Sequence, residues 1–142
     1  MTLVLKDTMY DIASVHDFLV TENTPTDLKT YKEFKLKLNR RIQRFLNKIE
    51  TCNKILFVRI GGTYEEAKQL EFVLSKIVQV EFEILLINEI EENQIIEYDW
   101  DFPYTCSIGM PLMENGLPST TNGEMWNYLF KGIRYSEIQS KG

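Results

Sequence analysis

The sequence predicts an α/β protein, with a small, mostly parallel sheet and flanking helices in a three-layer, Rossmann-like or flavodoxin-like arrangement. Two short apolar runs, residues 54–60 and 82–88, are rich in β-branched and aromatic side chains, which is typical of buried strands. Between them, apolar residues recur with helical spacing. A strand, a helix and a strand in this order form a right-handed parallel crossover, so residues 54–88 are expected to be the centre of the fold.

The amino-terminal part predicts one or two strands followed by a long helix. Short apolar clusters within residues 3–18 suit strands that end near His16. Thr24 is a candidate N-cap, and Pro25 occupies the favoured first helical position after it, so a helix should begin there. Its apolar residues recur at three- and four-residue steps to about Glu50, which predicts one apolar stripe.

The central crossover carries clear boundary signals. Residues 54–60 show almost no alternation, which predicts a strand covered on both faces, and Gly61 and Gly62 end it. Thr63 followed by Glu66 has the spacing of a capping box, so the next helix should start there.

The pattern after Asn88 is weaker. Residues 94–100 predict a further strand, whereas residues 102–119 contain three of the four prolines and predict mostly loop, with a short strand at 104–108. Thr121 and Glu124 repeat the capping-box spacing ahead of a last short helix. The length of 142 residues suits a single α/β domain.

Composition excludes several classes of function. The net charge of −5 argues against nucleic acid as a partner, and the basic side chains of the long helix suit a solvated helix face. There is no signal-peptide pattern and no apolar run of about 18 residues, so we expect a cytoplasmic protein without a membrane partner. Cys52 and Cys106 stand far apart, which indicates neither a disulfide nor a metal site. We expect no cofactor.

The best candidate site lies where the first central strand ends, because ligands bind at the carboxyl ends of parallel strands. Gly61, Gly62 and Thr63 fall at this end, although they complete no phosphate-binding motif and a simple tight turn is the alternative reading. Arg59 would reach the same crevice and contact an anion or a carbonyl oxygen; its alternative is a structural pair with Asp17 or Glu66.

Two further residues suit acid–base chemistry. His16 is the only histidine and therefore the only side chain that ordinarily titrates near neutral pH. Asn88, at the carboxyl end of the second central strand, could orient an imidazole, as an amide does in Cys-His-Asn enzymes. A structural histidine and a strand-end asparagine are the alternatives. Neither Cys52 nor Cys106 has a neighbouring cation that would activate it, so a nucleophile is missing.

Several segments resemble a bacterial family described as putative papain-like cysteine peptidases, a domain of unknown function. The His-Asp-Phe segment at 16–18 and the run RIGGTYEEA at 59–67 are the most diagnostic. The likeness covers about residues 4–99, with a looser match over 126–133. It is carried by YDIASVHDF, YKEFKLKLNRRIQRF, ILFVRIGGTYEEAKQLEFVLSKIV and ILLIN, at residues 10–18, 31–45, 55–78 and 84–88.

The resemblance implies a general base at His16 and an orienting amide at Asn88. In the family, the presumed nucleophile is a cysteine in a glycine- and serine-rich turn upstream of the His-Asp-Phe segment, and no residue here corresponds to it. We therefore expect a carboxyl-terminal part of the family's full domain, inactive as a peptidase in this form. Two alternatives remain: a small-molecule or anion-binding module at residues 59–63, in which Asp17 could take part, and an interaction module that forms a homodimer or docks a partner.

Overall fold

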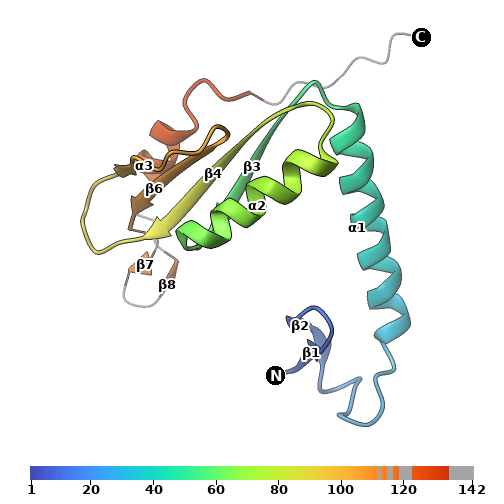
Figure 1. Cartoon of the computed structure of the whole chain (residues 1–142). Coiled ribbons are helices and arrows are strands. Elements are labelled where there is room, and N and C mark those ends of the chain that lie inside the picture. The colour runs from blue at the N-terminus through green and yellow to red at the C-terminus, as the bar shows by residue number, and fades with distance from the viewer. Residues whose placement is uncertain (112, 115–116, 119–122, 135–142) are drawn as a thin grey trace. The chain divides into compact units, whose positions relative to one another are not determined.

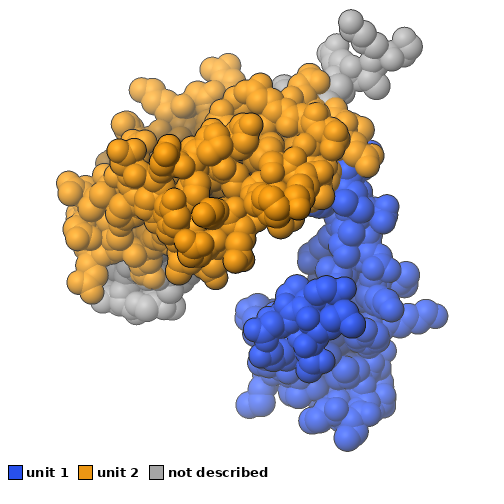
Figure 2. Space-filling model, in the orientation of Figure 1, with its two compact units in different colours: residues 1–48 blue, residues 49–142 orange. Residues whose placement is uncertain are grey.

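The computed structural model describes residues 1–111, 113–114, 117–118 and 123–134. The chain forms two compact units, residues 1–48 and residues 49–142 (Figure 2). Each unit is described by itself below.

The first unit contains an antiparallel hairpin of β1 (Thr2–Asp7) and β2 (Ile12–Leu19) (Figure 1). The predicted strands are confirmed, but His16 lies inside β2 and not at its end. Phe18 is fully buried, and its ring lies 5.0 Å from the ring of Phe34 on helix α1 (Tyr31–Thr51). This aromatic contact packs the hairpin against the first turn of α1.

Helix α1 begins at Tyr31, so the predicted start at Pro25 is wrong. The Thr24 hydroxyl accepts the N–H of Asp27 and the two backbones also pair, which closes a turn in place of a helix cap. Asn23 then organises the approach to the helix, because its Oδ1 accepts both the N–H and the hydroxyl of Thr30. A side chain that bonds nearby backbone in this way competes with helix formation.

The second unit contains a four-stranded sheet in the order β3-β4-β6-β5. Strands β3 (Lys54–Ile60), β4 (Glu81–Glu89) and β6 (Thr105–Met110) are parallel, and β5 (Ile96–Tyr98) is antiparallel to β6. The predicted crossover and its capping box are confirmed, with α2 (Tyr64–Ile77) between β3 and β4. A two-stranded ribbon, β7 (Met113–Glu114) and β8 (Leu117–Pro118), and helix α3 (Gly123–Leu129) follow.

The two faces of this sheet carry separate apolar clusters. Helix α2 covers one face, where Leu74 and Val78 pack with Phe82 and Ile84 (Figure 1). Helix α3 lies on the other face, where Trp126 and neighbouring side chains pack against a buried cluster that includes Ile87. Side chains on a strand alternate between faces, so Phe82 and Ile84 of β4 belong to the first cluster, and Leu85 and Ile87 belong to the second.

Two expectations for the sheet need correction. Strand β3 is an edge strand and is not covered on both faces, since the side chains of Val58 and Ile60 are 46% and 62% exposed. The short strand predicted at 104–108 is confirmed as part of β6, whereas most of the described residues in 102–119 lie in strands β6, β7 and β8 and not in a loop. The proposed cap at Thr121 lies outside the described residues.

Candidate functional site

The predicted turn after β3 has the geometry that its glycines suggest. Gly61 has a positive φ of 74°, a conformation that side-chain-bearing residues avoid. Its N–H donates to the carbonyl of Ile87 at 2.8 Å, which holds the turn against the end of β4. A Cβ atom on Gly62 would lie 3.2 Å from Leu86 Cδ1, so this position favours glycine for lack of space. The tight-turn reading of this pair is therefore confirmed.

Asn88 lies beside the same turn and is bonded to it at two points. Its Oδ1 accepts the N–H of Gly62 at 2.9 Å, and its Nδ2 donates to the carbonyl of Gly62 at 3.0 Å. The carboxamide thus pairs with the backbone of Gly62 in the way that a neighbouring strand would. This contact joins the carboxyl ends of β3 and β4, as the parallel topology predicts.

Thr63 and Glu66 complete the entry to α2. The Thr63 hydroxyl accepts the N–H of Glu66 at 3.3 Å, and Glu66 Oε2 accepts the N–H of Thr63 at 2.8 Å. That backbone N–H bond, above all, lowers the pKa of Glu66. Burial of the carboxyl opposes this effect, and the Thr63 hydroxyl and the positive charge of Arg59 lower the pKa further.

Arg59 lies over this turn. Its Nε donates to the carbonyl of Gly61 at 2.9 Å, and the side chain is largely exposed. The remaining guanidinium N–H groups can therefore receive an anion from solvent. In contrast, the N–H groups of Gly61, Gly62 and Thr63 already donate to acceptors of the chain itself. Any anion at this turn would bind the guanidinium, because these three amides are engaged.

His16 and Asp17 belong to the first unit. His16 is exposed on β2. Asp17 accepts the hydroxyl of Ser14 at 2.7 Å and forms an ion pair of 3.1 Å with Lys37. The hydroxyl bond, followed by the contact with Lys37, lowers the pKa of Asp17. A pair between Asp17 and Arg59 was one alternative from the sequence. In the structure, Asp17 instead forms its ion pair with Lys37 on α1.

The two cysteines lie in surroundings that do not activate a thiol. Cys52 directly follows the carboxyl-terminal end of α1, whereas activated thiolates favour the amino-terminal ends of helices. Burial raises the pKa of the Cys106 thiol, and the negative charges of Glu97 and Glu83 raise it further. The thiol lies 4.0 Å from Glu97 Oε1, to which it donates.

Cys106 lines a groove of about 610 Å³ on the face of the sheet opposite to α2. The groove is also lined by Leu56, Leu85, Tyr104 and Tyr128. Its volume falls within the range of about 300–1,000 Å³ that is usual for small-molecule sites. Sequence reasoning missed this groove, because it depends on the unforeseen central position of β6.

Glu71 is a further feature that the sequence analysis did not single out. It lies on α2 and is 8% exposed, and its Oε2 accepts the Thr105 hydroxyl at 2.5 Å and the N–H of Tyr104 at 3.2 Å. The carboxylate therefore anchors the start of β6 to α2. One sequence signal was available: Glu71 follows Leu70 within the apolar stripe of the helix.

The described residues show neither a metal centre nor a membrane span. In residues 1–111, 113–114, 117–118 and 123–134, no group of three or more His, Cys, Asp or Glu side chains is arranged to hold a metal ion. Of the helices within the same residues, none combines the length and the apolar character that crossing a membrane requires.

Comparison with known proteins identifies a family. No significant match was found among curated proteins or among solved structures. A family model matches residues 1–92, which comprise the hairpin, α1 and the whole β3–α2–β4 crossover. The matched part contains His16, the Arg59 turn and Asn88, as the sequence resemblance implies. The chain belongs to the family described as "Putative papain-like cysteine peptidase (DUF1796)".

Proposed function

We propose that this chain is a papain-like family member that does not use either of its own cysteines as a peptidase nucleophile. The environment of Cys106 is the observation that carries the proposal. A catalytic thiol needs a nearby cation or helix amino terminus that stabilises the thiolate, whereas Glu97 and Glu83 place negative charge beside this thiol. The polypeptide would then be inactive as a peptidase in this form.

The family resemblance supplies the roles of the remaining residues. His16 is the proposed general base and Asn88 the proposed orienting amide. Arg59 is the proposed contact for a developing oxyanion, since the neighbouring amides are engaged.

The test is hydrolysis of a fluorescent protein substrate by the purified chain, together with alkylation of each cysteine by iodoacetamide as a function of pH. We expect no hydrolysis above buffer, and alkylation of Cys106 only above the ordinary thiol pKa of about 8.5. Hydrolysis that Cys52→Ser or Cys106→Ser abolishes would overturn the proposal. If His16→Ala abolished the same hydrolysis, both residues would belong to one catalytic reaction.

An alternative proposal is a module that binds small carboxylates or phosphates at the turn of residues 59–63. The exposed Arg59 side chain, held at Nε by Gly61, supports it. Thermal-shift measurements with citrate and inorganic phosphate test it, with Arg59→Ala as the variant and Arg40→Ala, an exposed arginine on α1, as its control. Shifts that Arg59→Ala leaves unchanged would contradict this alternative.

The other alternative is self-association. Within the described residues, strand β3 lies at the edge of the sheet and carries exposed Val58 and Ile60, and sheet edges of this kind favour strand addition. Size-exclusion chromatography with light scattering tests it: a homodimer that Val58→Lys dissociates supports the proposal, whereas a monomer at high concentration contradicts it.

Other features of the chain also remain proposals. We infer a Rossmann-like or flavodoxin-like three-layer arrangement and a cytoplasmic, bacterial protein. The parallel strands with a helix on each face favour this fold class. The reading of residues 1–142 as one α/β domain stands as a proposal in the same way. Limited proteolysis tests it, since two independent domains would yield stable fragments.

A further inference from the structure

The groove beside Cys106 has an unusual combination of lining side chains. Most are apolar or aromatic, including Leu56, Leu85, Phe102 and Tyr104. Among the described residues that line it, Glu83 and Glu97 are the charged ones, and none is a lysine, an arginine or a histidine. The groove therefore presents apolar surface and negative charge together.

The register of the sheet places the two carboxylates on the same face. Cys106 on β6 pairs with Leu85 on β4, and Glu83 lies two residues before Leu85, so it points to the same side. Across the other edge of β6, Glu97 pairs with Ile108, which again shares a face with Cys106. The thiol consequently lies between two acidic side chains on neighbouring strands, and both contribute to its raised pKa.

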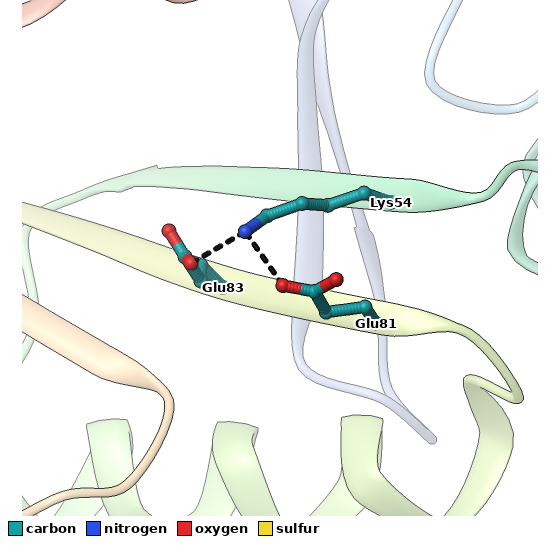
Figure 3. A network of polar contacts seen from close by, with 3 residues as sticks. All are labelled: Lys54, Glu81 and Glu83. Atoms are coloured by element: carbon teal, nitrogen blue, oxygen red, sulfur yellow. Dashed lines mark hydrogen bonds and ion pairs between the residues drawn. The ribbon is translucent and has the colours of Figure 1, made fainter.

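The two carboxylates differ in their partners. Lys54 on β3 donates to Glu81 at 2.7 Å and to Glu83 at 2.8 Å, so Glu83 shares one positive charge with Glu81 (Figure 3). Both bonds raise the pKa of Lys54 and keep it charged. Among the described contacts, Glu97 has the Cys106 thiol as its polar neighbour, and a thiol is a weak donor. A bound cation would therefore interact more favourably with Glu97 than with Glu83, which already contacts Lys54.

We propose that this groove binds a small organic cation, with its ammonium group beside Glu97 and its apolar body against the aromatic and aliphatic lining. Charge complementarity selects the occupant: an anion would meet two carboxylates, and a neutral apolar molecule would leave Glu97 without a counter-ion. Tyr104 and Tyr128 add ring faces that favour a nearby ammonium group. The groove is separate from the Arg59 turn, and the proposal goes beyond the proposed function because it assigns a ligand to the carboxylates beside Cys106.

Cys106 is a built-in reporter for the test. In a Cys52→Ser background, its rate of modification is measured with two methanethiosulfonates of similar size, one bearing a trimethylammonium group and the other a sulfonate. A change in thiol pKa affects both reagents equally, so the ratio of the two rates, relative to that for free cysteine, reports the local potential alone.

We expect the cationic reagent to react faster than the anionic one. One unit charge about 6 Å away in water changes each rate roughly threefold in opposite directions, so the ratio should exceed that for free cysteine about tenfold. Glu97→Gln should remove most of this excess, so that the ratio of the two rates approaches that for free cysteine. Glu89→Gln, which removes the same charge from an exposed position on β4 outside the groove, should leave the ratio unchanged.

Binding itself is tested by protection of Cys106 with matched probes. Phenethylammonium should slow modification by a neutral thiol reagent, whereas 3-phenylpropionate, of similar size and opposite charge, should not. Glu97→Gln should abolish the protection. The proposal is overturned by a rate ratio equal to that of free cysteine, by equal protection from both probes, or by protection from neither.

Discussion

Both polar atoms of the Asn88 carboxamide bind the backbone of Gly62, at 2.9 Å and 3.0 Å, across 26 residues of sequence. A single side chain therefore fixes the turn after β3 to the end of β4. This contact explains why an asparagine stands at a position where the sequence alone allowed either a catalytic or a structural role. Its structural role is visible in the folded chain, and its catalytic role is a proposal that measurements on variants can separate from it.

Replacing Asn88 by leucine should lower the free energy of unfolding by about 2 kcal/mol, because each of the two hydrogen bonds contributes about 1 kcal/mol. Asn88→Asp should be destabilised at neutral pH, since a carboxylate would face the carbonyl of Gly62. It should recover in acid, where the protonated carboxyl can donate to that carbonyl. Urea denaturation measures both effects.

Asn93→Leu is the matched control, because Asn93 is exposed in the loop after β4. If the two hydrogen bonds of Asn88 to Gly62 stabilise the fold, which we call the Asn88 clamp, Asn93→Leu should keep the free energy of unfolding of the parent chain. Equal losses in the two leucine variants would refute the clamp.

Gly61→Ala should cost about 1 to 2 kcal/mol of stability. The reason is conformational, since Gly61 has a φ of 74° and an added Cβ would meet no atom within 4 Å. Gly61→Asn should cost less, because asparagine tolerates the left-handed region better than alanine does. Gly123→Ala is the control: its Cβ would also lie in open space, and its φ is not in the left-handed region. Thermal unfolding that ranks the three variants otherwise would contradict this account.

Glu71→Ala should destabilise the chain by about 1 to 3 kcal/mol, because the Thr105 hydroxyl and the N–H of Tyr104 would lose their acceptor in a buried place. Glu71→Gln should be close to neutral, since both bonds end on one carboxylate oxygen that a carboxamide oxygen can replace. Gln69→Ala, on the exposed side of α2, controls for the helix itself. A glutamine variant as unstable as the alanine variant would argue that the negative charge matters more than the acceptor.

The sequence predicted the centre of this fold well because its signals there are local. The apolar run of β3 and the capping box at Thr63 and Glu66 involve neighbours in the chain, and both proved correct. The proximity of Gly62 and Asn88 could be predicted from the topology, because the carboxyl ends of neighbouring parallel strands lie at the same edge of a sheet. The side-chain bonds between them could not be read from spacing.

The errors had two causes, which are competing local hydrogen bonds before α1 and strand pairing around β6. Thr24 has the residue type of a helix cap, but its hydroxyl accepts the N–H of Asp27 in a turn, and Asn23 accepts from Thr30 just before the helix. The short strand predicted at 104–108 is part of β6, but its interior position depends on pairing with β4 on one side and β5 on the other. The burial of Glu71 depends on that pairing too, so neither it nor the groove beside Cys106 was foreseeable.

The capping box should make the stability of the chain depend on pH in a defined direction. The pKa of Glu66 is lower in the folded chain than its ordinary value of 4.5, chiefly because the N–H of Thr63 donates to the carboxylate. The unfolded chain therefore binds the proton more readily. The contribution of Glu66 to stability is fully present above the ordinary pKa and is lost as the pH falls through the lower, folded value.

The stability difference between the parent chain and Glu66→Gln should accordingly shrink between roughly pH 6 and pH 3, as urea denaturation at several pH values would measure. Glu65→Gln removes the same charge from the same helical turn without removing the bond to Thr63, so it isolates the effect of the helix dipole. If both glutamine variants showed the same pH dependence, the dipole would account for it. A dependence confined to Glu66 would instead tie the acid sensitivity of α2 to the turn that also carries Arg59, Gly62 and Asn88.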